Sequence, residues 1–249
     1  MRADQLLLSR GLAPSRSAAQ RLIESGAVLR AAGSPVRKAG EDVPEHEELR
    51  VTDDAELRYV SRGGLKLEGA LATTGIKVQG FTVLDMGQST GGFTDCLLKG
   101  GAEKVVGVDV GHGQLHASLA NDPRVVLLEG LHVRELASSG LQAHKPAGGF
   151  RLIVGDLSFI SMLGSLAQLA PWLAADGQLL LLIKPQFELG PKALNKGGLV
   201  KDKAQYAELE QQARAAVAAQ GWQWQGWFDS SITGGDGNRE FFLWASAAA

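Results

Sequence analysis

"VLDMGQSTGGF", residues 83–93, is the stretch that decides the fold of this 249-residue chain. An apolar strand passes into a polar turn with glycines, and the turn passes into a helix that begins near Gly91. Gly87, Gly91 and Gly92 let a ligand approach the backbone closely, and the start of the helix offers free N–H groups. The turn therefore predicts a ligand site, with a purely structural strand–helix turn as the alternative.

Acidic residues near this turn limit the kind of ligand. The spacing is not G-x-G-x-x-G, so the dinucleotide fingerprint is absent, and Asp85 before the turn would repel a pyrophosphate. A carboxylate there suits a positively charged ligand such as S-adenosylmethionine. Asp109 ends the next strand, about twenty residues past the turn, where an acidic residue commonly binds ribose hydroxyls or caps a helix. His132, in the loop after the third strand, would border the adenine or be a solvated loop residue.

Apolar strands recur along the rest of the chain. They cover residues 81–87, 104–111, 124–130, 150–159 and 178–186. Helical segments separate them, which favours a parallel sheet with helices on both faces. A helix is expected at 63–75, before the first strand. Residues 221–231 and 239–246 have no helix between them and predict an antiparallel edge, so the fold class is α/β, a Rossmann-like sheet with an antiparallel C-terminal edge.

The pattern before residue 59 is different. Short helices are expected at 3–11 and 14–26, the second with Ser15 or Ser17 as its N-cap. Short strands are expected at 27–30 and 48–51. The chain is therefore predicted to have a small α+β domain at 1–58 and a large domain at 59–249.

Composition points to a soluble cytoplasmic protein. Apolar residues make up 45% of the chain, the net charge is −2, and Cys96 is the single cysteine, so no intrachain disulfide is possible. We find neither a signal-like N-terminus nor a bilayer-spanning apolar run. Basic residues dominate through Lys38 and acidic residues dominate 40–56, which marks either an interaction surface or two solvated faces of one domain.

Four charged residues from distant segments are predicted to meet in one crevice. Asp156 and Lys184 end deeply apolar strands, and ligands bind beyond the carboxyl ends of such strands. Lys66 lies on the helix before the first strand, and Glu240 begins the last strand; each alone is also explained as a surface charge. Two lysines held by two carboxylates suit the deprotonation of a poorly acidic hydroxyl beside a methyl donor. No His/Cys cluster has ligand spacing, so no metal is expected.

These residues and several motifs resemble a known family. The four charged residues resemble the catalytic tetrad of FtsJ-type ribose 2′-O-methyltransferases. The wider match is to the TlyA family, whose members are called hemolysins and are also ribosomal RNA 2′-O-methyltransferases with an S4-like RNA-binding domain. The motifs that carry it are "YVSRGGLKLEGAL", "STGGFTDCLL", "VDVGHGQL", "GDLSFISM", "KPQFELG", "GGLVKD", "GNREFFLW" and, in the first domain, "AQRLIESGAVL".

The resemblance implies a role for each matched residue. Lys184 would be the general base on a ribose 2′-hydroxyl, supported by Lys66, Asp156 and Glu240. S-adenosylmethionine would be the cofactor, with S-adenosylhomocysteine as the product. The implied cofactor contacts are Asp85, Gly87, Gln88, Ser89, Thr90, Gly91, Gly92, Asp109, Val110, Leu131, His132 and Asp156. The family usually has a small residue at Gln88 and asparagine at His132, so these two positions depart from its pattern.

The partner implied is ribosomal RNA or a ribosomal subunit, and no membrane is expected. Basic residues of the first domain and a lysine-bearing loop beside Lys184 would contact phosphates, with salt-sensitive affinity. The residues are Arg2, Arg10, Ser15, Arg16, Arg21, Lys38, Lys192 and Lys196. Three alternatives stay open: an RNA-binding, ribosome-associated protein with weak or lost methyltransferase activity, a membrane-lytic hemolysin, and a small-molecule methyltransferase.

Overall fold

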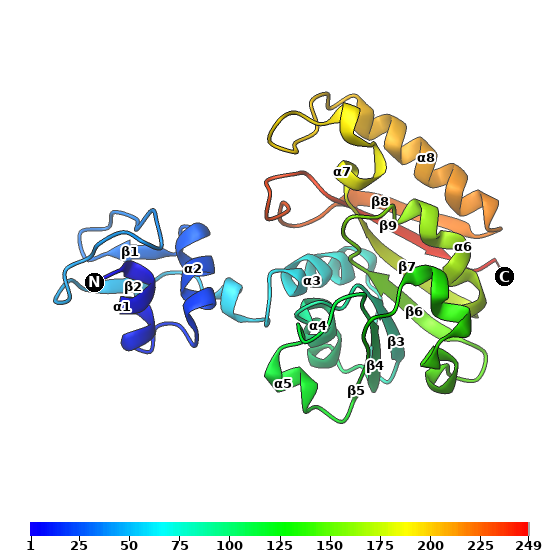
Figure 1. Cartoon of the computed structure of the whole chain (residues 1–249), viewed down its shortest axis with the longest axis horizontal. Coiled ribbons are helices and arrows are strands. Elements are labelled where there is room, and N and C mark those ends of the chain that lie inside the picture. Colours follow the sequence, from blue (N-terminus) through cyan, green and yellow to red (C-terminus); the bar gives the residue numbers. More distant parts are fainter. Residues whose placement is uncertain (249) are drawn as a thin grey trace.

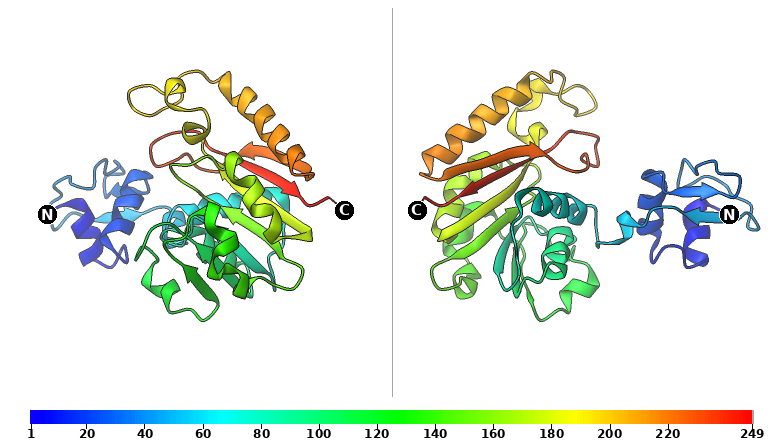
Figure 2. Two further views of the ribbon diagram at one scale, coloured as in Figure 1. Left: turned by 45° about the vertical axis from the view of Figure 1, so that its right-hand side comes forward. Right: turned by 180° about the vertical axis from the view of Figure 1, so that it is seen from behind.

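The computed structural model describes residues 1–248 and shows two folded units joined by a short linker (Figure 1). Ala249, the last residue of the expected large domain, lies outside the described residues. The smaller unit contains α1 (Ala3–Ser9), α2 (Arg16–Glu24) and the antiparallel pair β1 (Val28–Arg30) and β2 (Leu49–Val51). A 3₁₀ turn, η1 (Ala55–Leu57), follows, and the chain then enters the larger unit; the right-hand view of Figure 2 shows the linker between the two units.

Local sequence explains how α2 forms. Ser15 is the N-cap, because its hydroxyl accepts a hydrogen bond from the Ala18 N–H at 3.1 Å. Leu22 and Ile23 lie on the buried face of the helix, and Gly26 follows its end with a positive φ of 78°. The expected helix and one of its two candidate caps are thus observed.

The larger unit is built on one seven-stranded sheet in the order β5-β4-β3-β6-β7-β9-β8. Its strands are β3 (Thr82–Met86), β4 (Lys104–Val108), β5 (Val125–Leu128), β6 (Phe150–Gly155), β7 (Leu173–Ile183), β8 (Gln223–Asp229) and β9 (Phe241–Ser246). Strands β3 to β7 are parallel, and β9 pairs antiparallel with both β7 and β8. The predicted Rossmann-like sheet with an antiparallel C-terminal edge is confirmed.

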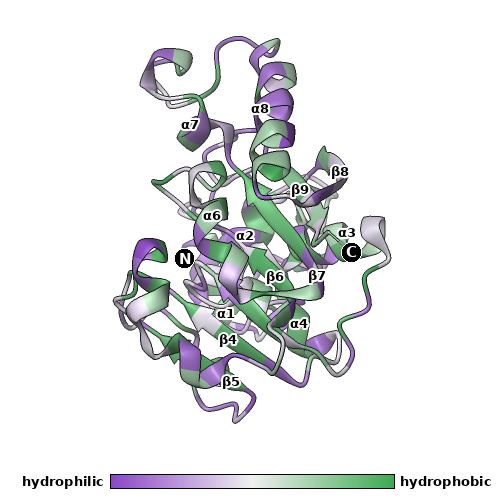
Figure 3. Cartoon of the chain, turned by 90° about the vertical axis from the view of Figure 1, so that its right-hand side faces the viewer, coloured by the Kyte–Doolittle hydropathy of each residue, from purple (hydrophilic) through white to green (hydrophobic). Residues whose placement is uncertain are grey.

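Both faces of this sheet are buried, which explains the nearly continuous apolar strands. Val83 and Leu84 are neighbours in β3 yet belong to different hydrophobic clusters, one on each face. Helices α3 (Gly63–Thr74) and α4 (Gly92–Lys99) pack on one face, and α6 (Leu166–Leu169) and α8 (Gln205–Ala219) pack on the other. Figure 3 shows the central strands as predominantly apolar.

Connections differ from the expected alternation at one side of the sheet. Only the four-residue α5 (Ala117–Ala120) follows β4, and two 3₁₀ segments, η2 (Val133–Ser138) and η3 (Gly140–His144), follow β5. His132 and Ser139 cap these segments with their side chains, so local side-chain bonds replace a long helix here.

The strand order places a ligand crevice between β3 and β6. The chain runs outward from β3 through β4 to β5, returns to the other side of β3 as β6, and continues to β7. Ligands bind at such a reversal, outside the carboxyl ends of the strands. Those ends are followed by the glycine turn after β3, by Asp156 after β6 and by Lys184 after β7.

Candidate active site

The glycine turn after β3 packs tightly against its neighbours. Gly87 and Gly91 have φ values of 81° and 93°, which favour glycine. A Cβ at Gly87 would lie 2.7 Å from the backbone oxygen of Asp156, and one at Gly92 would lie 2.9 Å from the Gly64 nitrogen. Side chains at these positions would push the turn away from β6 and α3, so the glycines keep the crevice narrow.

Two cavities adjoin this turn and share part of their walls. The larger, of about 360 Å³, is lined by apolar side chains that include Leu131 and Ile160 and by Asp109 at its polar side. The smaller, of about 240 Å³, contains Lys184 in its wall. Four residues line both cavities: Gly87, Ser89, Asp156 and Ser158. A bound molecule can therefore extend from an apolar compartment to a charged one.

Asp109 holds the polar side of the larger cavity. Its Oδ2 accepts a hydrogen bond from the Ser89 N–H at 2.7 Å, and its Oδ1 accepts one from the Gly111 N–H at 2.7 Å. Each carboxylate oxygen has a further acceptor site, so Asp109 fixes the turn and can still bind hydroxyls. These features fit S-adenosylmethionine. The apolar wall suits its adenine ring, Asp109 suits its ribose hydroxyls, and Asp156 suits its positive charge.

The four predicted tetrad residues come together as two ion pairs. Lys66 Nζ, on α3, donates to Glu240 Oε2 at 2.6 Å, and Lys184 Nζ lies 2.6 Å from Asp156 Oδ1. Burial raises the pKa of Glu240, and the charge of Lys66 lowers it. The charge of Asp156 raises this pKa further, and that of Lys184 lowers it. The two ion pairs come from four segments far apart in the chain, and their charges influence one another beside the smaller cavity.

Comparison with known proteins identifies the family. Residues 59–247 match the FtsJ-like methyltransferase family, and residues 1–49 match the S4 domain. The chain is 43% identical over 247 residues to the 16S/23S rRNA (cytidine-2'-O)-methyltransferase TlyA of Mycobacterium tuberculosis, covering 98% of this chain and 88% of the relative. The chain belongs to the TlyA family of FtsJ-like methyltransferases. The resemblance stated from the motifs is confirmed, and so is the expected cofactor, S-adenosylmethionine.

Other relatives show how far the similarity extends. Hemolysin A of Brachyspira hyodysenteriae is 36% identical, with 97% of this chain and 98% of the relative covered. A solved structure from Streptococcus thermophilus, described provisionally as a hemolysin, aligns with a TM-score of 0.74 at 36% identity and covers 100% of this chain and 88% of that one. An S-adenosylmethionine-dependent methyltransferase of Mesorhizobium loti aligns with a TM-score of 0.53 at 14% identity, covering 73% of this chain and 97% of that one, and shares the fold.

Two residues expected to touch the cofactor lie beneath the turn in this TlyA-family chain. Asp85 is fully buried and lines neither cavity. Gln88 borders the smaller cavity, but its Nε2 donates to the buried Thr94 Oγ1 at 2.7 Å, and that hydroxyl donates to Asp85 Oδ2 at 2.7 Å. The Gln88 amide fills the space that a Cβ at Gly107 would occupy. These residues therefore support the turn from below.

Burial also alters the charge of Asp85. Its pKa is raised to about 7, mainly by burial and further by the charges of Asp156 and Asp109, while the Thr94 hydroxyl acts in the opposite direction. Among the described residues, Asp85 Oδ1 has no hydrogen-bond partner. A cation bound above the turn would favour the ionised form of this carboxyl.

The remaining predicted cofactor residues surround the cavities. Thr90 and Gly92 border the smaller cavity, whereas Val110, Leu131 and His132 border the larger one. His132 also accepts the Arg134 N–H on its Nδ1 at 3.1 Å, because it caps η2. Its ring is thus held by the backbone at the edge of the cavity.

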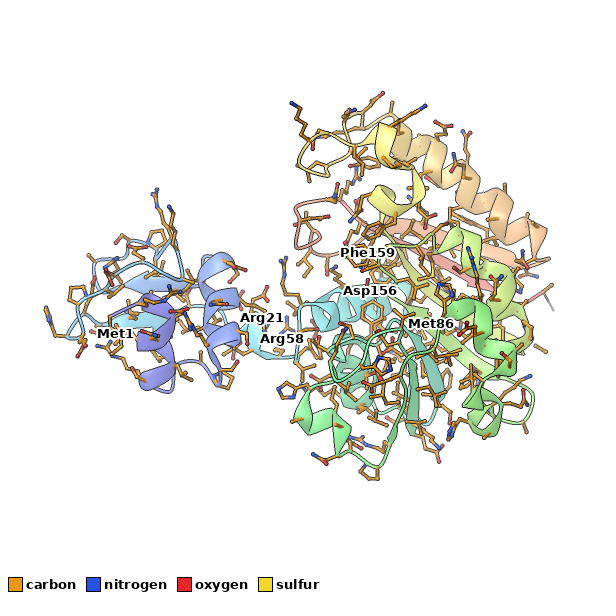
Figure 4. The ribbon with its side chains drawn as sticks, in the orientation of Figure 1. Met1, Arg21, Arg58, Met86, Asp156 and Phe159 are labelled. Carbon is orange, nitrogen blue, oxygen red and sulfur yellow. The ribbon has the colours of Figure 1, made fainter. Side chains whose placement is uncertain are left out.

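The sequence analysis missed two residues after β6 and one in α7 (Pro185–Glu188). Ser158 Oγ accepts a hydrogen bond from Lys184 Nζ at 2.8 Å. Phe159 is 87% exposed, has a positive φ of 68°, and lies 5.3 Å from the Phe187 ring, centroid to centroid. Figure 4 shows Phe159 near Asp156 at the crevice. The buried Glu188 carboxylate accepts hydrogen bonds from the loop at 161–163; only the motif "GDLSFISM" hinted at this loop.

The predicted RNA-binding residues lie in both units, and most of those in the S4 unit already have internal partners. Arg2 and Arg16 bind the buried Asp4 and hold its pKa below its usual range. Arg10 donates to backbone oxygens at 45 and 47, Arg21 donates to the backbone of Glu56, and Ser15 caps α2. Lys38, Lys192 and Lys196 are exposed. Figure 4 places Arg21 and Arg58 at the junction of the two units.

The boundary between the two units lies between the hydrophobic cluster of the first unit and helix α3. The hydrophobic cluster of the first unit extends to Leu49, with Leu57 packed against it, and the large-unit match begins at residue 59; the division at 58 and 59 stays a proposal. Within residues 1–248, no helix is long and apolar enough to cross a membrane.

Proposed function

We propose that this chain transfers a methyl group from S-adenosylmethionine to the ribose 2′-oxygen of a cytidine in ribosomal RNA. The relatives of Mycobacterium tuberculosis and Campylobacter jejuni are described as rRNA cytidine-2′-O-methyltransferases. The observation that carries the proposal is the Lys184–Asp156 pair, which lines the smaller cavity where that cavity adjoins the nucleoside-sized one.

Each ion pair has a distinct task in the reaction. Bound S-adenosylmethionine supplies an electrophilic methyl group on a sulfonium. Lys184, in its neutral form, accepts the proton from the ribose 2′-hydroxyl, and Asp156 stabilises the resulting ammonium at 2.6 Å. Lys66 and Glu240 form the buried neighbouring pair and keep the local charge balanced. Since little covalent chemistry falls to the protein, positioning supplies much of the rate.

RNA contact is proposed to come from both units. The half-exposed guanidinium groups of Arg2 and Arg16 still present N–H donors beside Asp4. Lys192 and Lys196 lie on the exposed loop that follows α7, shortly after Lys184. The exposed ring of Phe159 offers a stacking surface at the crevice, as proteins that bind unpaired bases commonly use. A structured RNA within a ribosomal subunit, in the cytoplasm, suits these separated contacts.

One labelling experiment tests the proposal directly. Purified protein is given a tritiated methyl donor with isolated small subunits, isolated large subunits or stripped ribosomal RNA, and the label is mapped. We expect label on a cytidine ribose, seen as resistance of the adjacent phosphodiester to alkali. Lys184→Ala should abolish transfer while cofactor binding, measured by calorimetry, is retained. Label on a base, or equal turnover by Lys184→Ala, would contradict the proposal.

A further inference from the structure

Ser158 lines both cavities, a position that it shares with Asp156 but with none of the other three tetrad residues. It lies two residues beyond Asp156, in the loop after β6, and borders both the larger and the smaller cavity. Its residue is exposed, and its Oγ accepts a hydrogen bond from Lys184 Nζ at 2.8 Å. The hydroxyl therefore touches the proposed base where the two cavities join.

Lys184 thus has two fixed oxygen neighbours from one loop. Asp156 Oδ1 lies 2.6 Å from its Nζ, and Ser158 Oγ lies 2.8 Å from it. A neutral amine has two N–H groups and one lone pair. Lys184 Nζ donates a hydrogen bond to Ser158 Oγ, whereas its contact with Asp156 is an ion pair. With one N–H group held at Ser158 and the other turned to the Asp156 carboxylate, the lone pair takes the third side of the amine, and Lys184 lines the smaller cavity.

The loop that carries Ser158 is held by the protein itself. Glu188 Oε2 accepts from Ser161 Oγ at 2.5 Å, and its Oε1 accepts from the Met162 N–H at 2.7 Å. Glu188 lies only four residues after Lys184, in α7. The segment that contains the base and the segment that contains its hydroxyl partner are therefore clamped together before any substrate is bound.

We propose that Ser158 is a positioning residue that sets the orientation of the Lys184 amine. This inference rests on the proposed function, in which Lys184 is the base. Ser158 carries no proton in the reaction; it restricts rotation of the amine so that the lone pair faces the ribose hydroxyl. With Asp156 alone, either N–H group can face the carboxylate, so the lone pair has two possible directions.

The test compares Ser158→Ala with Ser158→Thr, which keeps a hydroxyl. We expect Ser158→Ala to lower kcat for RNA methylation about 10- to 100-fold, the range of a lost orienting contact, with KM for S-adenosylmethionine changed less than about 2-fold. Ser158→Thr should recover most of kcat. Ser138→Ala, an exposed serine on η2, serves as the matched control. Turnover of Ser158→Ala equal to wild type would refute the positioning role.

A second readout does not depend on activity. In protein labelled with [15N]lysine, the Lys184 ammonium signal is assigned by its loss in Lys184→Ala. We expect its protons to exchange with solvent several-fold faster in Ser158→Ala than in wild type, because one acceptor is gone. If the wild-type protein transfers no methyl group to ribose, the proposed function fails. The exchange rate of the Lys184 protons then tests the contact with Ser158 without any measurement of turnover. Unchanged exchange in Ser158→Ala would then overturn the inference.

Discussion

Replacing Asp85 by Asn should make the methyltransferase unit more stable, by an amount that grows as the pH rises from acid to neutral and above. Asp85 is fully buried beneath the glycine turn, and its pKa is raised from 3.8 to about 7. Folding thus strengthens proton binding by this carboxyl. Its contribution to stability is complete below pH 3.8 and is lost as the pH rises through about 7. Asn has no proton to lose and can still accept the Thr94 hydroxyl.

The size of the effect follows from the pKa change. One pKa unit corresponds to about 1.4 kcal/mol, so the rise at Asp85 limits the effect to about 4 kcal/mol above pH 8. Part of this is already present at pH 5, because the unfolded carboxyl is ionised there. Between pH 5 and pH 8, the advantage of Asp85→Asn in unfolding free energy should therefore grow by about 2–3 kcal/mol.

Urea denaturation followed by tryptophan fluorescence is the assay. All five tryptophans lie beyond residue 171, so the signal reports the sheet unit and not the S4 unit. Asp122→Asn is the matched control, because Arg124 lowers the pKa of Asp122 and its contribution changes only at acid pH. An advantage of Asp85→Asn that stayed constant from pH 5 to pH 8 would refute the reasoning that Asp85 is ionised against its burial.

Three further predictions concern the crevice and the RNA contacts. Glu240→Gln leaves Lys66 buried without its counter-ion and should lower the unfolding free energy by about 3–5 kcal/mol; urea midpoints check this, and a cost under about 1 kcal/mol would show that the pair is not buried in solution. Phe159→Ala removes an exposed ring, so stability should stay within about 0.5 kcal/mol while methylation of RNA falls about 5- to 100-fold, as for one lost stacked base; unchanged kcat/KM would exclude stacking. Replacing exposed Lys192 and Lys196 by Ala should reduce the slope of log affinity against log salt by about 0.7–0.9 per lost phosphate contact; filter binding at several salt concentrations measures it, and an unchanged slope would remove both lysines from the RNA surface.

The location of the site was predictable from the sequence because strand ends in a parallel sheet share one edge. Asp156 and Lys184 each follow an apolar run, so their proximity follows from the strand order alone. Which carboxylate binds which lysine did not follow. Lys66 binds Glu240 because α3 packs on the face next to β9, and no local pattern sets that packing.

The support beneath the turn was not predictable either. Asp85 was expected at the ligand because its carboxylate precedes the turn, and Gln88 was expected there from the family resemblance. Gln88 borders the smaller cavity, and its amide packs over Gly107, which has no side chain to oppose it. Gln88 follows β3 and Gly107 lies in β4, so this contact depends on the register in which the two strands pair.

The two lysines of the tetrad differ in their access to the cavities, and this difference supports one of them as the base. The side chains of Lys66 and Glu240 are 9% and 2% exposed, whereas those of Lys184 and Asp156 are 12% and 21% exposed. Lys184 and Asp156 line the smaller cavity, and Lys66 lines neither of the two cavities. A base must reach the proton it removes, so we propose that Lys66 acts through its charge on the neighbouring pair. The same asymmetry explains why Ser158 holds Lys184: an amine that is open to a cavity needs a second oxygen to fix its direction, whereas a buried amine is fixed by its surroundings.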